Sequence, residues 1–589
     1  MNMKDSLVAL LVESMRTLQA RGDVPSDLDL TPQLERARDR QFGDFASNLA
    51  MVLAKPSRQS PRKLAEQLIN ALPSDPRVER VEVAGPGFIN FYVRPDGHHS
   101  TIGQVLDQAA AYGHTNLGAG QHIQVEFVSA NPTGPLHVGH GRGAAYGACV
   151  ANVLAACGYE VTREYYVNDA GRQMDILATS VWLRYLEVCG EELSFPDNGY
   201  RGDYVIDLAK SLHQQLGKRL HKSAESVFDE LPADGRDGGD KEAHIDALIK
   251  RCQQLLGETE YRLLFDHGLD GIRADIAADL EAFGVHYDLW FSERSLSEAD
   301  AIEKAIEALV AKGLVYQEAG ARWFASTRFG DDKDRVVQRE DGRYTYFAAD
   351  IAYHHNKFER GFDRIVNVWG ADHHGYIPRV RAAVEALGHD PEHLQVRLVQ
   401  FAILYRGSER VQMSTRSGSF ITLRELREEV GNDAARFFYV LRKAEQHMDF
   451  DLELAKSQSK DNPVYYIQYA HARIASMRRK LNADAATTFD PAYALEQLHQ
   501  LTEEREQQLV DEIARYPEVV EHAARTLEPH LIAHYLRDLA SHFHVYYNGH
   551  RVLVEEANLR AARVALCVAV QQVLRNGLDL LGVQAPERM

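Results

Sequence analysis

The chain has 589 residues, which at roughly 150 residues per domain predicts three or four domains. Hydrophobic residues make up 45% and charged residues 26% of it, and this composition excludes a largely disordered chain, a collagen-like chain and a small disulfide scaffold. The 66 basic and 85 acidic residues give a formal net charge of −19. Because a uniformly acidic surface repels nucleic acid, an RNA partner would require locally concentrated basic residues.

The five cysteines stand far apart, and no two of them form a Cys-x-x-Cys pair. Their odd number and wide spacing argue against a disulfide framework and against a cysteine zinc site. A reduced, cytoplasmic protein is the simplest interpretation. The first 15 residues mix apolar residues with Lys4, Asp5 and Glu13, which is typical of an amphipathic helix and not of a signal peptide. No apolar run approaches about 18 residues, so we expect no membrane span.

The N-terminal segment, residues 1–112, is predicted to form a small α+β domain. Helical patterns come first, and two short strands are expected over 78–92 around the turn at 85–87, where the sequence is Gly-Pro-Gly.

A second domain is predicted over 113–431. It begins with an apolar, β-branched strand at 123–128, followed by a stretch rich in Gly and Pro at 129–143 and a helix from about 139 to 158. A strand, a glycine-rich turn and a helix form the start of a nucleotide-binding α/β unit.

The parallel sheet of this domain is expected to be interrupted by an insertion. The pattern is mostly helical from about 176 to 345, and strands resume at 364–368 and 396–404 with a helix near 379–387 between them. Beyond about residue 432 the pattern is helical, which predicts an all-α domain over 432–589.

The strongest local motif is Asn-Pro-Thr-Gly-Pro-Leu-His-Val-Gly-His at 131–140. Two imidazoles three residues apart, His137 and His140, fall on one face at the start of the predicted helix. Helix N-terminal amides attract anions, and Gly139 would let a flat base lie against the backbone. The motif therefore predicts a site for the adenine and α-phosphate of ATP. The alternative is a pair of ordinary histidines at a helix start, which the strand-turn-helix context disfavours.

Two further motifs are weaker by themselves. The polar loop Val-Gln-Met-Ser-Thr-Arg-Ser-Gly at 411–418 could donate hydrogen bonds to a departing pyrophosphate, although solvated loops often have such residues. The block Gly-Ala-Asp-His-His-Gly at 370–375 ends a predicted strand, where open α/β sheets bind ligands. Adjacent histidines here and at 354–355 suggest a metal, but they point in different directions and match no zinc spacing. We expect no metal site.

Together these motifs resemble a known family. The first resembles the His-Ile-Gly-His motif of class I aminoacyl-tRNA synthetases, and the polar loop resembles their Lys-Met-Ser-Lys-Ser loop. The segments 126–134, 163–171, 369–375, 41–48 and 585–589 are similar to bacterial arginyl-tRNA synthetases. The resemblance covers essentially the whole chain.

The resemblance implies a multidomain α/β fold. A Rossmann-type catalytic domain split by the insertion would follow a small N-terminal tRNA-contacting domain and precede a helical anticodon-binding bundle. The implied ligase activates L-arginine with ATP, releases pyrophosphate and transfers arginine to the 3′-terminal adenosine of its tRNA. ATP would come with Mg²⁺ held by phosphates and water, with no tightly bound protein-ligated metal. A cytoplasmic monomer with no membrane contact is expected, and activation would wait for tRNA.

The resemblance also assigns residues to each substrate. The catalytic residues would be His137, His140 and Arg416, with the histidines stabilising charge at the α-phosphate. The ATP-binding residues would be the two histidines with Gly139, Gly370, Asp372, His373, Met413, Ser414 and Thr415. Because carboxylates match a guanidinium, the arginine-binding set would be Glu126, Asn131, Tyr346, Asp350 and His374.

For tRNA, the resemblance points to the C-terminal bundle and to one residue near the N-terminus, namely Tyr465, Tyr469, Arg473, Arg478 and Asn48. Cations suit phosphates and aromatic faces suit unstacked bases. The alternative is a core tyrosine stripe beside a solvated charged face.

The polar loop departs from the class pattern. Gln412 stands where the class has its first Lys, and Thr415-Arg416 replaces Lys-Ser. Some arginyl enzymes without that lysine have one just before the histidine motif, but Gly134 occupies this position here. Arg410 and Arg416 are the candidate cations. Two alternative functions stay open from the sequence: another class I nucleotidyl- or adenylyl-transferring enzyme, and a non-catalytic RNA-binding relative.

Overall fold

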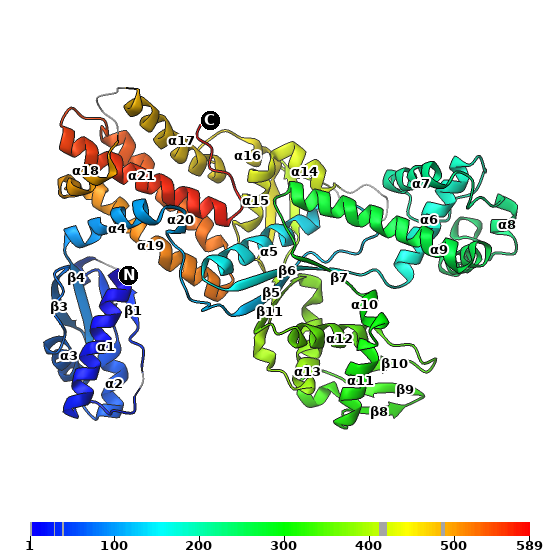
Figure 1. Ribbon diagram of the computed structural model, residues 1–589, viewed down its shortest axis with the longest axis horizontal. Coiled ribbons are helices and arrows are strands. Elements are labelled where there is room, and N and C mark those ends of the chain that lie inside the picture. Colours follow the sequence, from blue (N-terminus) through cyan, green and yellow to red (C-terminus); the bar gives the residue numbers. More distant parts are fainter. Residues whose placement is uncertain (1–2, 29, 38–39, 412–420, 484–488) are drawn as a thin grey trace.

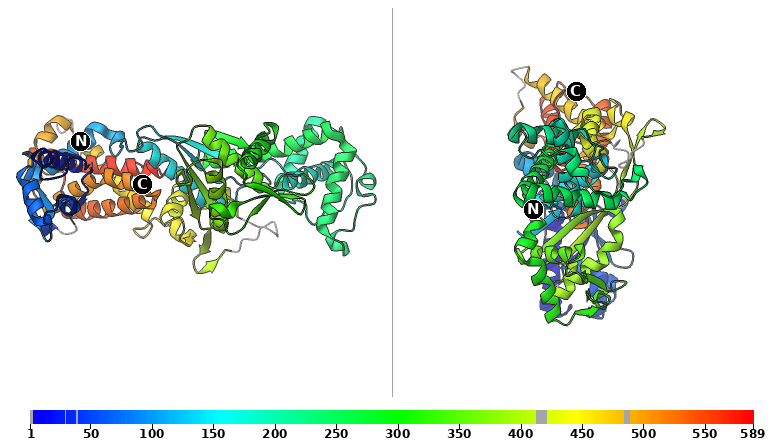
Figure 2. Two further views of the ribbon diagram at one scale, coloured as in Figure 1. Left: turned by 90° about the horizontal axis from the view of Figure 1, so that it is seen from below. Right: turned by 90° about the vertical axis from the view of Figure 1, so that its right-hand side faces the viewer.

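The computed structural model describes residues 3–28, 30–37, 40–411, 421–483 and 489–589. The molecule is elongated (Figure 1), with a small N-terminal domain and a helical bundle at one end and a helical lobe at the other. A parallel sheet lies between them, and a second view shows the same order along the long axis (Figure 2).

The N-terminal domain packs three helices on an antiparallel sheet with the order β1-β2-β4-β3. Its elements are α1 (Met3–Arg21), β1 (Leu34–Arg36), β2 (Phe45–Ser47), α2 (Leu49–Ser57), α3 (Pro61–Asn70), β3 (Val78–Ala84) and β4 (Phe88–Val93). The strand pair predicted over 78–92 is confirmed as β3 and β4. A core of its own, from Leu7 to Val93, holds this domain together.

The next helix, α4 (Pro95–Gln108), packs against the C-terminal bundle although we expected it in the N-terminal domain. The segment after it is fixed there too, because the Tyr112 hydroxyl donates to the carbonyl of Ile513 over 3.0 Å. The small domain with its own core therefore ends near residue 93, earlier than the predicted boundary at 112. Arg36 on β1 also pairs with Glu518 of the bundle at 3.1 Å.

The central sheet has five parallel strands in the order β12-β11-β5-β6-β7. Its strands and the two helices that matter most for the site are β5 (His122–Glu126), α5 (Val138–Ala156), β6 (Glu160–Val167), β7 (Leu289–Ser292), α12 (Tyr346–Glu359), β11 (Arg364–Gly370) and β12 (Leu394–Val399). The predicted unit of strand, glycine-rich turn and helix is thus confirmed as β5 and α5.

Three expectations about strands need correction. The strand predicted over 396–404 is two strands: β12 joins the parallel sheet, while β13 (Ala402–Arg406) pairs with β14 (Glu409–Arg410) and β15 (Met448–Asp451). Strand β15 lies in the segment expected to be all helical, and β7 lies inside the predicted insertion 176–345 and pairs with β6. Both are four residues long, too short to show a period of two within a helical background.

Helices form the lobe at the far end of the molecule (Figure 1). They are α6 (Arg172–Val188), α7 (Asp203–Leu216), α8 (Ala224–Phe228) and α9 (Lys241–Ala282). Helix α9 bends at Gly257, whose φ of 72° departs from helical values. A smaller subdomain follows, made of α10 (Arg294–Glu298), α11 (Ala301–Ala311), β8 (Val315–Glu318), β9 (Ala321–Phe324), β10 (Arg335–Gln338) and α13 (Ile377–Leu387), against which α12 packs.

The C-terminal part begins with α14 (Leu423–Val430), α15 (Asn432–Val440) and α16 (Leu452–Lys456), and continues as the bundle α17 (Pro463–Asn482), α18 (Pro491–Glu496), α19 (Glu504–Thr526), α20 (His530–Gly549) and α21 (Ala557–Leu580). Apolar side chains at helical spacing, such as Leu539 and Phe543, are fully buried between its helices. In the described ranges, no helix is long and apolar enough to cross a membrane.

Arg142 joins helix α5 to the segment that precedes the bundle. Its side chain is 1% exposed, and its guanidinium donates to the carbonyls of Gln400, Tyr439, Lys443 and Gln446 over 2.7–3.4 Å. Burial lowers its pKa to about 10, so it stays charged at neutral pH. A planar donor group of this size can serve several acceptors that an ammonium group would reach less well.

We therefore expect Arg142→Met to lower the Tm by roughly 5 °C or more. Each buried acceptor left without a donor costs about 1–3 kcal/mol of stability. For a domain of roughly 150–250 residues, each kcal/mol lost lowers the Tm by about 2–4 °C. Thermal unfolding followed by circular dichroism measures the shift. Arg525→Met is the control, since Arg525 forms an exposed pair with Glu521 and should change the Tm by about 1 °C at most. Equal shifts for the two variants would contradict this account of Arg142.

Candidate active site

Two histidines form the cap of helix α5. The backbone N–H of Gly139 donates to Nδ1 of His137 over 3.0 Å, and the backbone N–H of His137 donates to Nδ1 of His140 over 3.3 Å. The two rings stack with centroids 3.8 Å apart. A Cβ on Gly139 would stand 2.7 Å from the His137 ring. The imidazole of His137 is thus a reason for the glycine at this position, and the predicted contact of Gly139 with a nucleotide base stays a prediction.

Both imidazoles are neutral at pH 7. Burial lowers the pKa of His137, and burial with the neighbouring His137 lowers the pKa of His140 to about 3. Because each Nδ1 accepts a backbone hydrogen bond, the single ring proton is inferred to lie on Nε2. The pair therefore presents two Nε2–H donors at a helix N-terminus. Such a pair can donate hydrogen bonds but carries no positive charge.

Three carboxylates from different elements lie close enough to one tyrosine to raise its pKa. Glu126 ends β5, Glu293 follows β7, Asp350 lies on α12, and Tyr166 on β6 stands among them. Burial is the main cause that raises the pKa of Tyr166, and the charges of Glu293, Asp350 and Glu126 raise it further. The ends of neighbouring parallel strands thus bring together carboxylates that are far apart in the sequence.

Two of these carboxylates are held in an environment that disfavours their ionised form. Burial raises the pKa of Glu293 to about 7, with further contributions from the charges of Asp350 and Asp169. Burial also raises the pKa of Asp350 to about 6, against a hydrogen bond from the Tyr376 hydroxyl that lowers it. Among the described residues, neither carboxylate forms an ion pair. A cation placed between them would restore their charges.

Glu126 is different because its charge is already paired. Nζ of Lys357 lies 2.5 Å from Oε2 of Glu126, and the lysine side chain is fully buried. The Ser129 hydroxyl donates to the other oxygen over 2.9 Å, and Lys357 also donates to Asn367 over 2.8 Å. The structure therefore pairs Glu126 with a cation of the protein itself, which sequence reasoning did not foresee.

The remaining residues assigned to arginine lie around this cluster. Asn131 is exposed and donates to Oε1 of Gln173 over 2.9 Å. Tyr346 is 65% exposed, with its hydroxyl beside Gly171. His374 is exposed on the short helix Ala371–Tyr376; it is Tyr376, two residues later, that contacts Asp350.

The candidate ATP residues lie partly at the same edge of the sheet. Gly370 ends β11, which pairs with β5, and a Cβ on it would stand 2.5 Å from Oδ1 of Asp372. Asp372 and His373 are exposed and 3.6 Å apart. Arg410 is exposed on β14. Met413, Ser414, Thr415 and Arg416, with Gln412, lie outside the described residues.

On helix α17, three of the residues assigned to tRNA share one face. Tyr465 and Tyr469 stack with centroids 6.1 Å apart, Tyr469 is 41% exposed, and Arg473 lies over its ring at 5.5 Å. Arg478 belongs to another side of the helix, where it donates to Oε1 of Gln571 over 2.9 Å. Asn48 lies far from them, at the start of α2 in the N-terminal domain.

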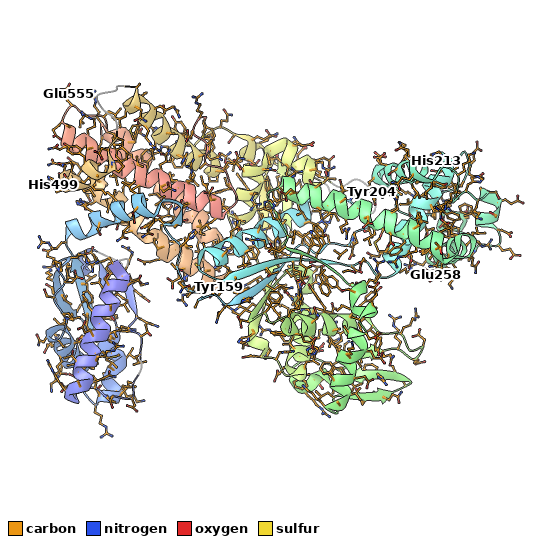
Figure 3. The ribbon with its side chains drawn as sticks, in the orientation of Figure 1. Tyr159, Tyr204, His213, Glu258, His499 and Glu555 are labelled. Atoms are coloured by element: carbon orange, nitrogen blue, oxygen red, sulfur yellow. The ribbon has the colours of Figure 1, made fainter. Side chains whose placement is uncertain are left out.

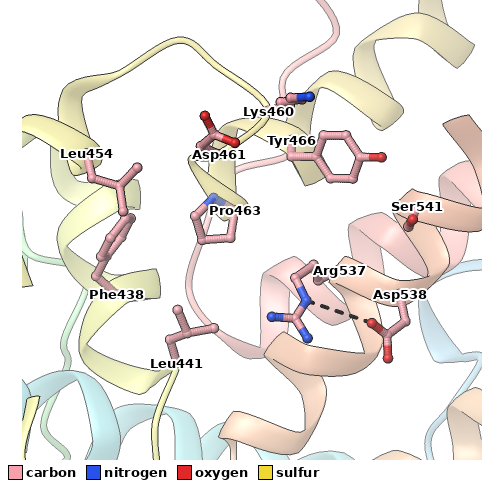
Figure 4. Close-up of a pocket in the computed structure, with 10 residues that line it drawn as sticks. All are labelled: Phe438, Leu441, Leu454, Lys460, Asp461, Pro463, Tyr466, Arg537, Asp538 and Ser541. Atoms are coloured by element: carbon pink, nitrogen blue, oxygen red, sulfur yellow. Dashed lines mark ion pairs between the residues drawn. The ribbon is translucent and has the colours of Figure 1, made fainter.

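A cavity of about 430 Å³ opens beside this helix, between α15, α16, α17 and α20. Figure 4 shows the ring of Tyr466 on one side and the pair of Arg537 and Asp538, 3.8 Å apart, on the other. Its walls contain none of the carboxylates or histidines described above. The chemistry-bearing cluster is therefore separate from this cavity.

Comparison with known proteins agrees with this architecture. Family models match as follows: Arginyl tRNA synthetase N terminal domain over residues 7–93; tRNA synthetases class I (R), catalytic domain, over 101–194 and 271–480; and DALR anticodon binding domain over 467–589. A curated arginine–tRNA ligase of Thioalkalivibrio sulfidiphilus is 58% identical, and one of Halorhodospira halophila is 56% identical, each with 100% of both chains covered.

The chain belongs to the arginyl-tRNA synthetase family. The arginyl-tRNA synthetase structure of Thermus thermophilus has a similar fold, with a TM-score of 0.73, 23% identity and 100% of both chains covered. The predicted fold class is thus confirmed. The interval 195–270, which the catalytic family model leaves out, falls within the helical lobe.

We expect Lys357→Met to destabilise the protein strongly, by about 3–5 kcal/mol, because it leaves the Glu126 carboxylate buried without its partner. The double variant Glu126→Gln with Lys357→Met should recover much of this loss, since a neutral amide is less costly to bury. Thermal unfolding of both variants measures the effect. Lys443→Met removes an exposed pair with Glu528 and serves as the control, with little change expected. A double variant no more stable than Lys357→Met would contradict the pairing.

Proposed function

We infer that the protein ligates arginine to its tRNA. It activates L-arginine with ATP to arginyl-adenylate, releasing pyrophosphate, and transfers arginine to the 3′-terminal adenosine of the tRNA. Full-length membership of the family supports this activity. One observation of the site fits it in particular: Glu293 is buried, Asp350 is partly buried, and neither carboxylate has an ion-pair partner among the described residues. A cationic substrate would supply one.

The two alternative functions fit less well. Another class I nucleotidyl-transferring enzyme does not account for the DALR anticodon binding domain matched over 467–589. A non-catalytic RNA-binding relative would not need the carboxylate cluster or the paired Nε2–H donors of His137 and His140. ATP–pyrophosphate exchange with each amino acid, with and without tRNA, separates the three. Exchange that depends on arginine supports the proposal, and exchange that does not depend on any amino acid would contradict it.

For arginine, we propose that the guanidinium pairs with Glu293 and Asp350. Its planar donors match two carboxylates, and Tyr166 lies among these groups. Glu126 stays beside the substrate, but its paired charge suits a supporting role through Ser129 and Lys357 better than the guanidinium contact that we first expected. Asn131, Tyr346 and His374 lie at the rim, where they would contact the rest of the amino acid.

For ATP, we propose that the substrate carboxylate attacks the α-phosphorus while pyrophosphate leaves. Donors from Nε2 of His137 and His140 would stabilise the negative charge that gathers on the α-phosphate oxygens. Neither histidine needs to transfer a proton, because a carboxylate is already a nucleophile. Since both rings are neutral, positive charge must come from Mg²⁺ bound to ATP and from an arginine, Arg416 or Arg410.

The other nucleotide contacts remain proposals of the same kind. Gly139, Gly370, Asp372 and His373 would lie against the nucleotide, and the loop residues Met413, Ser414 and Thr415 would donate to its phosphates.

For tRNA, we propose that the stacked face of α17 meets the anticodon loop. An exposed tyrosine next to a stacked tyrosine and an arginine suits unstacked bases, which favours Tyr465, Tyr469 and Arg473 over a buried core stripe. Arg478 and Asn48 would contact the tRNA backbone at other places. A cytoplasmic monomer whose activation step waits for tRNA completes the proposal.

The histidine roles can be tested without disturbing the helix cap. His137→Asn keeps an N-cap acceptor but removes the Nε2–H donor. We expect the rate of adenylate formation to fall by roughly 10²–10³, with the KM for ATP within about threefold of the parent and an unchanged Tm. His137→Ala should lose both the donor and the cap, and so melt at a lower temperature. Near-normal turnover of His137→Asn would show that this imidazole is no more than a cap.

The carboxylate pair predicts how arginine binding depends on pH. Arginine pairs with the ionised carboxylates, and Glu293, with a pKa of about 7, becomes protonated as the pH falls from 8 to 6. The KM for arginine should therefore rise roughly tenfold over this range, while the KM for ATP changes little.

Steady-state aminoacylation at several pH values measures this dependence. Glu293→Gln should raise the KM for arginine by roughly 30-fold at pH 8, a loss of about 2 kcal/mol from a charge-assisted pair, and should flatten the pH profile. Glu298→Gln, at an exposed glutamate of α10, is the matched control. A profile for Glu293→Gln as steep as that of the parent would exclude this residue from the guanidinium site.

A further inference from the structure

The segment between β5 and α5 has a strained start. Val128 and Ser129 have φ values of 67° and 42°, in the left-handed region that a β-branched residue rarely adopts. Such a backbone persists only where its surroundings hold it in place. Here it directs the chain from Glu126, in the carboxylate cluster, to His137 at the helix cap. Residues 127–134 are called the substrate turn below.

Three tyrosine hydroxyls hold the substrate turn by its carbonyl groups. Tyr287 donates to the carbonyl of Phe127 over 3.0 Å, and Tyr165 donates to that of Ala130 over 2.9 Å. Tyr204 donates to the carbonyl of Thr133 over 2.8 Å. The first two tyrosines lie in or next to the central sheet, whereas Tyr204 comes from α7 of the helical lobe. Figure 3 shows it where the lobe meets the central domain.

Tyr204 also fits closely against the turn. A Cβ on Gly134 would stand 3.0 Å from the Tyr204 hydroxyl and 3.2 Å from the ring carbon that carries it. A side chain at position 134 would therefore require this tyrosine or the turn to shift by a few tenths of an ångström. Burial raises the pKa of Tyr204, so its hydroxyl keeps its proton and remains a donor.

The lobe is attached to the second half of the site as well. On α9, Asp275 and Asp279 form ion pairs with Arg424 and Arg427 of α14. The residue before α14, Thr422, forms a β-bridge with His137. The lobe thus contacts the turn through α7 and the partner of the histidine cap through α9, on either side of the same site.

We propose that Tyr204 is a positioning residue for the activation of arginine, through which the helical lobe fixes the substrate turn. The turn joins the carboxylate cluster to the two imidazoles, so a displaced Thr133 carbonyl changes the distance between the bound amino acid and the α-phosphate. Misplacement of reacting groups by small distances has large effects on rate. The proposal rests on the function proposed above and adds a role for a lobe that supplies none of the assigned site residues.

The first test compares two Tyr→Phe variants of the full chain. Tyr204→Phe keeps the ring and removes the hydroxyl. Tyr185→Phe, in the same lobe, removes a hydroxyl that donates to the carbonyl of Gly217 over 2.5 Å, away from the turn. Aminoacylation with arginine, ATP and tRNA gives kcat and KM, and thermal unfolding gives the Tm.

We expect Tyr204→Phe to lower kcat/KM for arginine and for ATP by roughly five- to tenfold, in line with one lost hydrogen bond, with a Tm within about 2 °C of the parent. Tyr185→Phe should lower the Tm but keep both kcat/KM values within about twofold. A merely structural role for Tyr204 would move the Tm and leave the kinetics unchanged. That result, or an equal kinetic loss in Tyr185→Phe, overturns the proposal.

A double-mutant cycle with Gly134→Ala gives an independent test. The added Cβ meets the Tyr204 hydroxyl, so Gly134→Ala should lower kcat/KM by about tenfold or more in the parent and by clearly less in the Tyr204→Phe background. Such non-additivity is the signature of direct contact, and additive effects would overturn the proposal. If the parent failed to charge tRNA with arginine, the proposed function would be wrong. If the parent charged tRNA and Tyr204→Phe matched it, only the role of Tyr204 would be wrong.

Discussion

A buried ion pair between Lys357 and Glu126 fixes helix α12 on the central sheet. The lysine is enclosed on all sides, and it bonds both to Glu126 on β5 and to Asn367 on β11. The amide of Asn367 in turn contacts the ring of His354, 2.8 Å away. A polar contact of this kind allows helix α12 few alternative positions on the sheet, because each displaced group would lose its partner in a low-dielectric interior. The position of Asp350, on the same helix, depends on it.

Burial shifts the pKa values of the carboxylates and the histidines of the site in opposite directions. Its carboxylates, Glu293 and Asp350, are kept where their ionised forms are disfavoured, and its imidazoles are kept neutral. In the proposed function, a cationic amino acid would bind at the carboxylate end of this site, and the uncharged imidazole donors would face a phosphate at the other end. The substrate turn, residues 127–134, joins the two ends. Its hydrogen bonds therefore set the distance between the carboxylates and the two histidines.

The helical lobe and the segment before the bundle are attached to the substrate turn and to helix α5. The lobe reaches the turn through Tyr204, and the segment before the bundle is joined to α5 by Arg142, which serves carbonyl groups on both sides of that junction. By contrast, the N-terminal domain has a separate core and contacts the bundle through the pair of Arg36 and Glu518. Rigid attachment is therefore concentrated around the β5–α5 junction.

The sequence determined what is local. A β-branched strand, a glycine-rich turn and two histidines at a helix start are close in the chain, and periodicity with turn chemistry was sufficient to predict β5, α5 and the place of His137 and His140 at the start of that helix. The helical bundle and the β3–β4 hairpin were predictable for the same reason. The family resemblance gave the fold class as a whole, which the comparisons confirm.

Only the tertiary structure decided which distant side chains meet. Glu293 follows a strand of four residues that has no readable period, so its place among the carboxylates became visible only when β7 was seen to pair with β6. Glu126 was expected to face the substrate guanidinium, and the fold pairs it with a lysine 231 residues away. Tyr204 bears no local motif at all. Hydrogen bonds and ion pairs of this range depend on three-dimensional packing, which a pattern along one segment of chain does not encode.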